Sequence, residues 1–206
     1  MSTFFVGVAA NGLRTGETRH GERRSVTPGI VMLMHRSPSR PPEHLSVLDD
    51  FLWREFDSNA AWSAWATERS DAHASRIRTD YARAKALQAA LRRLQIVNMG
   101  EAPDPEAAQD VERIAAACDV RPTVRADGTT AFSASSSPVA DLVISVLGAM
   151  SDGSWKRFKR CRNRAQCTAS FYDTTKSGTR AWCSMRTCGA REKMRRLRAD
   201  RRTAGV

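Results

Sequence analysis

The chain has 206 residues, 41% of them hydrophobic and 27% charged, with a formal net charge of +11 at pH 7. This length suits one ordinary domain, or a medium domain with a small module attached. No stretch reaches the roughly 18 consecutive apolar residues that a transmembrane helix needs. The short apolar run at the start lacks the preceding basic residues of a secretory signal. We therefore expect a cytoplasmic protein with no membrane partner.

The charge is distributed unevenly along the chain. Residues 1–40 contain six basic residues (Lys or Arg) and two acidic ones. Residues 41–153 contain 11 basic and 17 acidic residues, and residues 154–206 contain 16 basic and three acidic residues. The corresponding net charges are +4, −6 and +13. Because clustered Lys and Arg release counterions from phosphate backbones, the basic end indicates a nucleic-acid partner. The alternative is a solvated basic tail.

Three segments follow from composition and periodicity. Residues 1–40 are rich in Gly, Arg, Ser and Pro and show no hydrophobic period, which predicts a disordered extension. Residues 41–153 show helical periodicity, and residues 154–202 carry the cysteine cluster and most of the basic residues. The expected fold class is mainly α, with a helical N-terminal domain that includes a small β-hairpin, followed by a small four-cysteine zinc finger with a basic helix.

Apolar residues at spacings of three and four predict the helices of residues 41–153. The first helix is expected to begin at Glu43, and a second, short helix to follow a cap at Asn59. A long helix is expected from Asp71 to Gly100, and a fourth from Asp104 to Cys118. The residues expected to face the core are Leu45, Leu48, Phe51, Leu52, Phe56, Ile77, Tyr81, Ala84, Leu87, Leu91, Leu94, Val111, Ile114 and Ala115.

The second half of this region predicts a hairpin and two further helices. Strands over 121–124 and 129–132 flank the turn "ADG". Ser137 and Pro138 are an N-cap and first-turn pair that opens an apolar helix, buried nearly all round. The stretch "SWKRFKR" at 154–160 predicts a further short helix.

Several residues outside the cysteine cluster have a structural and a functional interpretation. Trp53, Trp62 and Trp65 are expected in the core, the alternative being the lining of a ligand pocket. Neither a nucleophile elbow, a phosphate-binding loop nor metalloprotease spacing is present, and Asp49 and Asp50 are expected to be solvated. We therefore expect that the protein is not an enzyme.

Four of the five cysteines fall within 28 residues near the C-terminus. Cys161 and Cys167 have five residues between them, Cys183 and Cys188 have four, and fifteen separate the two pairs. Two close pairs joined by a loop supply the tetrahedral sulfur donors that Zn²⁺ prefers, whereas Cys118 is expected to be a small buried hydrophobe. Four thiolates leave no open position for water, which favours a structural over a catalytic site.

The residues around the cysteines predict a miniature core and a basic helix. Three aromatic residues lie between or beside the pairs and are expected to pack around the metal, although base stacking is the alternative for the last two: Phe171, Tyr172 and Trp182. Ser184 is a good N-cap for a helix extending to about Ala199, with Met194 and Leu197 placed to dock it on the finger. Residues expected to contact nucleic acid, from the turn and from one helical stripe, are Lys176, Arg180, Arg186, Arg191, Arg195, Arg198 and Arg202.

The run "FYDTTKSGTRAWCSMRTCGAREKMRRLRA" with its paired cysteines resembles the bacterial CGNR zinc-finger family. By element order, the helical region from Glu43 to Arg160 is similar to the ABATE domain that usually precedes this finger. The resemblance implies a stress-responsive transcription regulator whose zinc ligands are Cys161, Cys167, Cys183 and Cys188. Two departures are visible: the first pair has five intervening residues where the family more often has four, and Ala190 replaces the family's defining Asn.

Two functions from different classes follow. The first is a zinc-dependent protein that binds duplex DNA through the basic finger and regulates transcription, with the helical domain acting as a sensor or interaction domain. The second is an RNA-binding or ribosome-associated accessory module that uses the same finger. A small-molecule effector in the helical domain and a homodimer are both compatible with the sequence.

Overall fold

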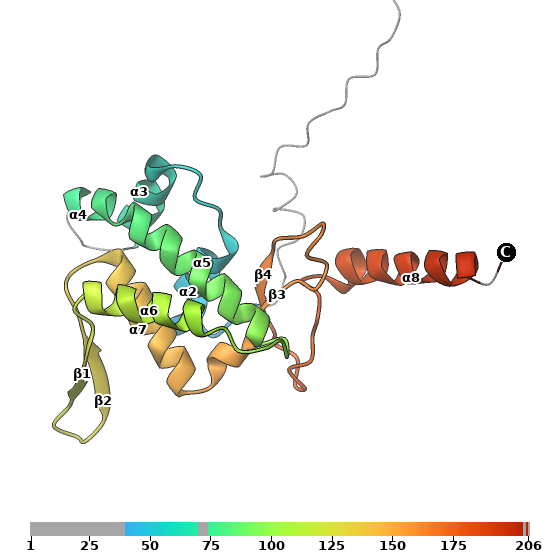
Figure 1. The fold of residues 1–206 in the computed structure, drawn as a ribbon. Helices are drawn as coiled ribbons and strands as arrows, with labels where there is room; N and C mark the ends of the chain where they lie inside the picture. The colour runs from blue at the N-terminus through green and yellow to red at the C-terminus, as the bar shows by residue number, and fades with distance from the viewer. Residues whose placement is uncertain (1–39, 70–73, 204, 206) are drawn as a thin grey trace, which may run out of the picture.

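The computed structural model describes residues 40–69, 74–203 and 205, so the extension predicted over residues 1–40 lies almost wholly outside the described residues. The described chain folds into a helical body, a compact cysteine-bearing segment and a terminal helix (Figure 1). Its strands are confined to two short antiparallel pairs within the described ranges. The mainly α fold class predicted from the sequence is confirmed.

Helix α5 (Tyr81–Val97) lies at the centre of the helical body and packs against α2, α3, α4, α6 and α7. The elements of the body are η1 (Glu43–Leu45), α2 (Ser46–Trp53), α3 (Asn59–Thr67), α4 (Ala74–Thr79), α5, α6 (Pro105–Ala117) and α7 (Pro138–Ser151). Most residues predicted to face inward are buried in one cluster; Tyr81, Leu94 and Ala115 lie partly buried against it. The helical period thus identified the core correctly.

Aromatic side chains from α2, α3 and the loop between them form one cluster within this core. Phe51, Phe56, Trp62 and Trp65 lie with neighbouring ring centroids 5.4–6.3 Å apart, a spacing typical of packed aromatic pairs. Trp62 and Trp65 are therefore core residues, as expected. Asp50 was expected to be solvated but is buried, because its Oδ2 accepts a 2.6 Å hydrogen bond from Trp65 Nε1.

The long helix predicted from Asp71 to Gly100 is interrupted at Asp80, which separates α4 from α5; Asp71 itself lies outside the described residues. The carboxylate of Asp80 is fully buried. Ser137 Oγ donates to Asp80 Oδ2 at 2.5 Å, and Arg83 pairs with Oδ1. Because Ser137 also caps α7 through Val139 N and Ala140 N, this one contact ties the α4–α5 junction to the start of α7.

Two further boundaries differ from the sequence prediction by one residue. Ser58, not Asn59, caps α3, because its Oγ accepts from Ala61 N at 3.1 Å. In the hairpin, β1 (Arg121–Val124) has the predicted bounds, whereas β2 (Thr130–Ser133) begins one residue later than predicted. The reason is that the backbone N–H and the hydroxyl of Thr129 both donate to Asp127 Oδ1, which keeps Thr129 in the turn. This hairpin projects from the body, away from the C-terminal helix (Figure 1).

The stretch "SWKRFKR" is not the short helix that was predicted. Only Ser154–Arg157 forms a 3₁₀ turn (η2), and the chain then enters strand β3 (Phe158–Arg160), which pairs with β4 (Ser170–Tyr172). Phe158 and Tyr172 are directly paired across these two strands, and their ring centroids lie 5.0 Å apart. Both side chains belong to the core of the helical body, which favours the strand at this point.

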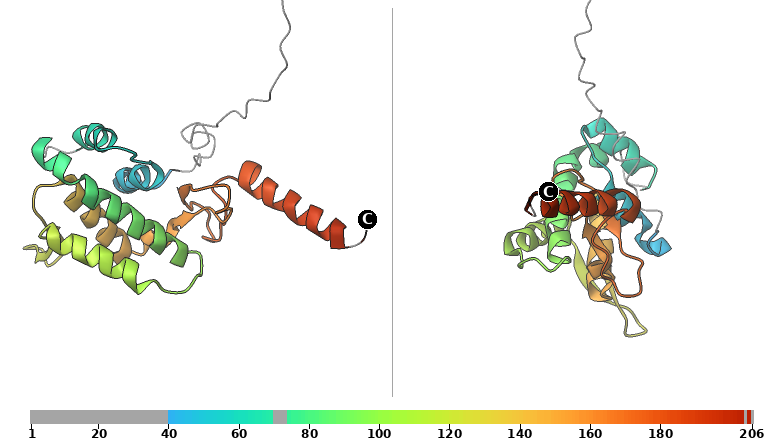
Figure 2. Two further views of the ribbon diagram at one scale, coloured as in Figure 1. Left: turned by 45° about the horizontal axis from the view of Figure 1, so that its top comes forward. Right: turned by 90° about the vertical axis from the view of Figure 1, so that its right-hand side faces the viewer.

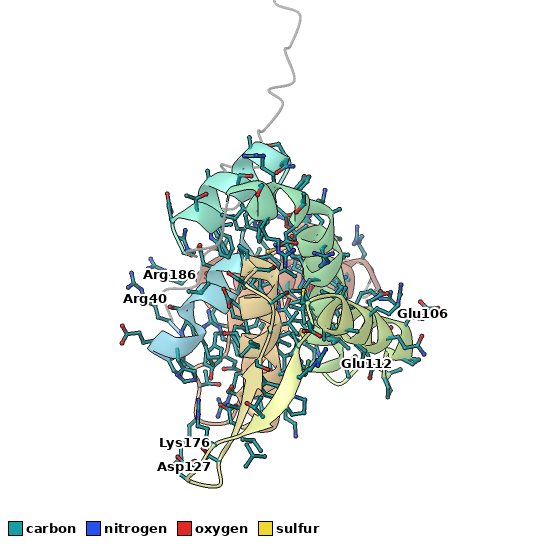
Figure 3. All side chains as sticks on the ribbon, turned by 90° about the vertical axis from the view of Figure 1, so that its left-hand side faces the viewer. Arg40, Glu106, Glu112, Asp127, Lys176 and Arg186 are labelled. Atoms are coloured by element: carbon teal, nitrogen blue, oxygen red, sulfur yellow. The ribbon has the colours of Figure 1, made fainter. Side chains whose placement is uncertain are left out.

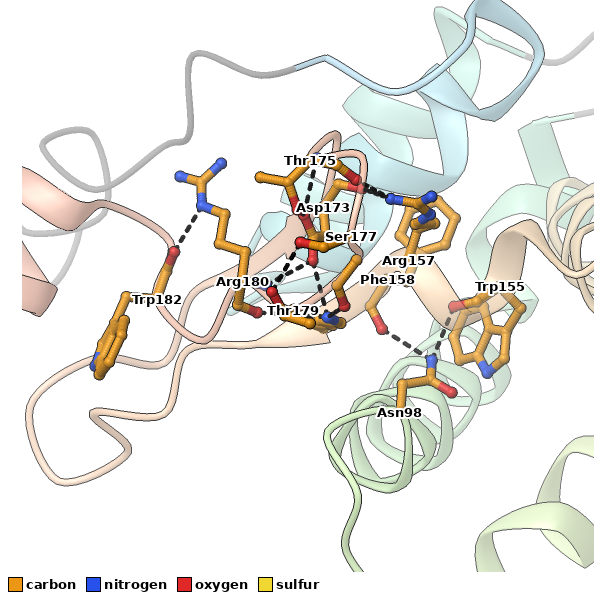
Figure 4. A network of polar contacts seen from close by, with 12 residues as sticks. Asn98, Trp155, Arg157, Phe158, Asp173, Thr175, Ser177, Thr179, Arg180 and Trp182 are labelled. Carbon is orange, nitrogen blue, oxygen red and sulfur yellow. Dashed lines mark hydrogen bonds and ion pairs between the residues drawn. The ribbon is translucent and has the colours of Figure 1, made fainter.

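Polar contacts join the β3–β4 pair to the end of α5. Asn98 Nδ2 donates to the backbone oxygens of Trp155 and Phe158 at 2.8 and 2.9 Å, as Figure 4 shows. Buried Gln95 accepts a 2.8 Å hydrogen bond from Ser170 Oγ. The cysteine-bearing segment is therefore attached to the body by packing and hydrogen bonds on both strands of its hairpin.

The terminal helix α8 (Ala190–Thr203) stands apart from the rest of the molecule. It points away from the helical body beyond the cysteine-bearing segment in Figure 1 and in the left view of Figure 2, and none of its residues is buried. Among the helices that the structure describes, none is both long and apolar enough to cross a membrane.

The Asn98 contacts predict a measurable loss of stability. Asn98→Ala leaves two carbonyl groups at the junction without their donor, and we expect it to lower the free energy of unfolding by about 1–3 kcal/mol. The matched control is Asn59→Ala, which removes two exposed hydrogen bonds, one to Arg78 O and one from Ser63 Oγ, and is expected to cost less than about 1 kcal/mol. Urea unfolding of the zinc-loaded protein measures both, and equal losses would contradict this role for Asn98.

Candidate metal centre

Four cysteines from three chain segments converge at one end of the β3–β4 pair. Cys161 directly follows β3, Cys167 precedes β4, Cys183 precedes a single π-helical turn, η3 (Met185–Gly189), and Cys188 lies within it. Cys161 N donates to Ala169 O at 2.9 Å and thereby continues the strand pairing. Ser184 caps the π-helical turn through Thr187 N, as the sequence predicted for the helix start. All four cysteines are buried.

The sulfur positions fit a tetrahedral metal site. One ligand atom from each cysteine lies within 4.8 Å of all the others. The Sγ atoms of Cys167 and Cys183 are 3.7 Å apart, as are those of Cys183 and Cys188. Four sulfurs at about 2.3 Å from a zinc ion form a tetrahedron with edges of about 3.8 Å. The observed separations therefore match that coordination.

The electrostatics of the cluster also favour a bound cation. Hydrogen bonds from the Cys167 and Cys183 thiols lower the pKa of the Cys161 thiol, and the backbone N–H groups of Cys183 and Asn163 add to that effect. Burial raises the pKa of the Cys188 thiol to about 12, and the neighbouring sulfur charge adds to it. By themselves the four thiols cannot all ionise at neutral pH, whereas a divalent cation stabilises all four as thiolates.

Comparison with protein families decides which kind of metal site this is. Residues 157–201 match the CGNR zinc finger. The four buried thiols are the zinc site of this finger, and the zinc cofactor predicted from the sequence is confirmed. Because all four ligands are cysteines, the site holds the ion in a closed, structural arrangement. The match does not extend over an ABATE domain, so that resemblance stays a prediction. Comparison with curated proteins finds no relative of the chain.

The finger has a small apolar cluster of its own. Ala169 and Phe171 are buried with the four cysteines, and Trp182 packs partly buried against them. Tyr172, which was expected in this cluster, instead belongs to the core of the helical body. The reason is strand alternation, because β4 turns Phe171 towards the zinc site and Tyr172 towards Phe158.

A buried ion pair that sequence analysis missed holds the loop after β4. Lys159 Nζ lies 2.9 Å from Asp173 Oδ2, and both side chains are nearly inaccessible to solvent. Asp173 also accepts hydrogen bonds from the backbone N–H groups of Thr175 and Arg180 and from the Thr175 hydroxyl (Figure 4). Lys159 donates in turn to the Gly178 and Arg180 carbonyl groups. Sequence analysis missed this pair because residues 154–160 were predicted as a helix, whereas Lys159 lies in strand β3.

The protonation state of Asp173 follows from these contacts. Burial by itself raises the pKa of the carboxyl group, but the hydrogen bonds from Lys159, Thr175 and Arg180 outweigh it and lower the pKa to about 2. The ordinary value in an unfolded chain is about 3.9. The stabilisation from the ionised carboxylate is therefore present above about pH 4 and is lost as the pH falls towards 2.

Arg180 was expected on an exposed arm in contact with nucleic acid, but the structure places it within the finger. Its guanidinium lies over the Phe171 ring, 5.2 Å from the centroid. The guanidinium donates to Trp182 O at 2.8 Å and to the backbone oxygen of the zinc ligand Cys183. These contacts orient the approach to the zinc site, and Arg180 is half-buried as a result.

The other arginines predicted to contact nucleic acid line one groove beside the zinc site. The groove has a volume of ≈ 1200 Å³ and runs between the loop 162–166 and helix α8. The residues lining it that were predicted are Arg186, Arg191, Arg195, Arg198 and Arg202. Arg162 and Arg164 also line it and were missed, because the helical stripe gave no reason to include the loop between the first two cysteines.

The remaining predicted contact, Lys176, does not line this groove. It is exposed in the turn after β4 and lies well apart from Arg186 in Figure 3. The expected docking of α8 through Met194 and Leu197 is also wrong, since these side chains are 46% and 40% exposed. Among the elements that the structure describes, α8 makes its main contacts with η3, and none of its residues is buried.

The zinc assignment predicts one zinc ion per chain in metal analysis of the purified protein. Cys183→Ser is expected to reduce bound zinc strongly and to abolish the hydrogen-exchange protection of residues 157–189, because three thiolates leave the tetrahedron open. Cys118→Ser is the matched control, since Cys118 is a buried thiol in the helical core. Full zinc content in Cys183→Ser, or equal zinc loss in both variants, would contradict the assignment.

The buried pair predicts a large effect of removing its cation. Lys159→Met leaves the Asp173 carboxylate buried without its counter-ion, and we expect the free energy of unfolding to fall by about 3–5 kcal/mol at pH 7. Glu101→Gln, which breaks the exposed pair with Arg164, is expected to cost less than about 1 kcal/mol. Urea unfolding at constant zinc concentration compares them; a Lys159→Met cost no larger than that of Glu101→Gln would refute the role of the pair.

Proposed function

We propose that this protein binds duplex DNA through the arginine groove of its CGNR finger, and that it acts as a transcription regulator by binding rather than by catalysis. The observation that carries the proposal is the continuity of positive charge from the finger into α8. Arginines of the loop 162–166, of η3 and of α8 line a single groove next to the zinc site. Such a surface releases counterions from a phosphate backbone and so binds nucleic acid.

The form of α8 favours duplex DNA. A helix of 14 residues is about 21 Å long, and none of its side chains is buried in the protein. The B-DNA major groove is about 12 Å wide and admits a helix, whereas the major groove of duplex RNA is too narrow. The stripe from Arg191 to Arg202 spans about 16 Å, which corresponds to about five base pairs.

Zinc would control the direction of this helix. Cys188 lies in the π-helical turn that continues directly into α8, so the metal fixes the turn from which the helix projects. Packing on the body cannot do this, since α8 has no buried residue. In this proposal, removing zinc abolishes DNA binding because the arginines lose their common orientation.

The helical body is proposed as a sensor or interaction domain, in keeping with the stress-response role that the family resemblance implies. Its attachment through Asn98 and Gln95 gives it a fixed position next to the finger. A small-molecule effector, a homodimer and a cytoplasmic location belong to this proposal as well. Reduced thiols in the cytoplasm would keep the four cysteines available to zinc.

One observation favours RNA or single-stranded nucleic acid as the partner. Trp182 lines the groove among the arginines, and aromatic side chains in basic grooves stack on unpaired bases. Its Nε1 is buried and has no hydrogen-bond partner among the described residues. Titration of the protein with duplex DNA and with structured RNA at one salt concentration separates the two; tighter binding of RNA would replace the proposed function with this one.

The groove predicts which arginine substitutions weaken binding. Arg198→Ala and Arg202→Ala should each weaken binding to any duplex, and each should reduce the slope of log K against log salt by about 1. Arg113→Ala on α6 removes an exposed arginine outside the groove and should leave both quantities unchanged. Fluorescence anisotropy at several salt concentrations measures them. An unchanged salt slope in both groove variants would contradict the proposal.

A further inference from the structure

One residue of the groove does not suit simple attraction of phosphates. Among the described residues that line the groove, Glu192 is the one acid. A carboxylate in this position repels a phosphate backbone and lowers the affinity for any nucleic acid. Its side chain is nevertheless only 17% exposed, because two arginines enclose it. The arrangement of those arginines indicates what Glu192 does.

Glu192 holds Arg195 by both of its carboxylate oxygens. Arg195 Nε donates to Oε2 and Arg195 Nη2 donates to Oε1, each at 2.8 Å. Arg196 Nε shares Oε1 at 2.8 Å. These hydrogen bonds lower the pKa of Glu192 to about 2, so the carboxylate stays ionised at neutral pH. An exposed ion pair within one helix adds little to stability, so the main consequence is the fixed orientation of Arg195.

The two hydrogen bonds to Glu192 leave one edge of the Arg195 guanidinium free to donate to another group. Nε and one hydrogen of Nη2 are taken by Glu192, while Nη1 and the second hydrogen of Nη2 remain as two parallel donors. Two parallel donors match the O6 and N7 acceptors of guanine in the major groove. Because its charge is already compensated, Arg195 attracts phosphates less than Arg198 and Arg202, which have no ion-pair partner among the described residues.

We propose that Glu192 orients Arg195 as the residue that recognises a guanine in the DNA major groove, while Arg198 and Arg202 contact phosphates. This inference rests on the proposed binding of duplex DNA. Glu192 is a positioning residue here, and Arg195 makes the base contact. Ala190, which lacks the amide of the family's Asn, cannot make a bidentate contact to a base, and Arg195, which lines the same groove, supplies one instead.

The chain contains a matched control for this proposal. Arg196 binds the same carboxylate as Arg195, with the same 2.8 Å distance, but it does not line the groove. Arg195→Lys and Arg196→Lys both keep the positive charge and remove the guanidinium fork. A purely electrostatic or structural role predicts that the two substitutions have the same effect, whereas base recognition predicts an effect of Arg195→Lys alone.

The test begins with selection of preferred sites from a random duplex library by the full-length, zinc-loaded protein. Affinities of the wild type and the variants are then measured at one salt concentration for the selected site and for sites with single G·C pairs replaced. We expect the wild type to discriminate at one G·C pair by on the order of ten- to hundred-fold. Arg195→Lys should lose this discrimination and Arg196→Lys should keep it. Glu192→Gln should lose it while binding unselected duplex at least as tightly.

The possible results separate this inference from the function on which it rests. If the wild type binds duplex DNA but selects no sequence, or if Arg195→Lys keeps the discrimination, the guanine contact is wrong and DNA binding stands. Equal loss in Arg195→Lys and Arg196→Lys also overturns it, as does discrimination that survives Glu192→Gln. If the wild type binds no duplex at all, the proposed function itself fails. Equal zinc content and circular dichroism across the variants establish that folding is unchanged.

Discussion

Coordination of one zinc ion by four buried thiolates is the interaction on which the C-terminal part of this protein depends. Without a cation the four sulfurs cannot ionise together, because burial and mutual repulsion favour the neutral thiols. The finger has little else to fold around, since its own apolar cluster contains only Ala169, Phe171 and part of Trp182 besides the cysteines. In a segment this basic, metal binding supplies much of the free energy of folding.

The finger and the helical body share one hairpin, and this makes them mechanically continuous. Phe158 and Tyr172 complete the apolar core of the body, while Phe171 on the same strand as Tyr172 packs against the zinc ligands. The Lys159–Asp173 pair then holds the loop that leads to Cys183. A change in the packing of the body around α5 thus has a direct physical route to the zinc site, through residues that contact each other.

The distribution of charge explains why binding is assigned to one side of the molecule. The segment from residue 154 onward carries a net charge of +13, and seven of its arginines line the groove beside α8. Phosphate attraction alone would be served by arginines without acidic neighbours. In the proposed complex with DNA, the enclosure of Glu192 by Arg195 and Arg196 separates two tasks within the same helix, a general attraction to the backbone and an oriented donor pair.

Local patterns in the sequence determined the helices, the Ser137 and Ser184 caps, most of the core positions and the four zinc ligands. Each of these depends on residues close in the chain or on the strong preference of zinc for four thiolates. Tertiary structure decided the break at Asp80 and the strand at 158–160, because these follow from partners farther away in the sequence, Ser137 and Tyr172. It also decided the internal placement of Arg180, whose partners are near in sequence but are brought together by the folded finger. The same reason placed Arg162 and Arg164 opposite α8. A helical stripe predicts which arginines share a face, but only the folded zinc site determines what lies across the groove from them.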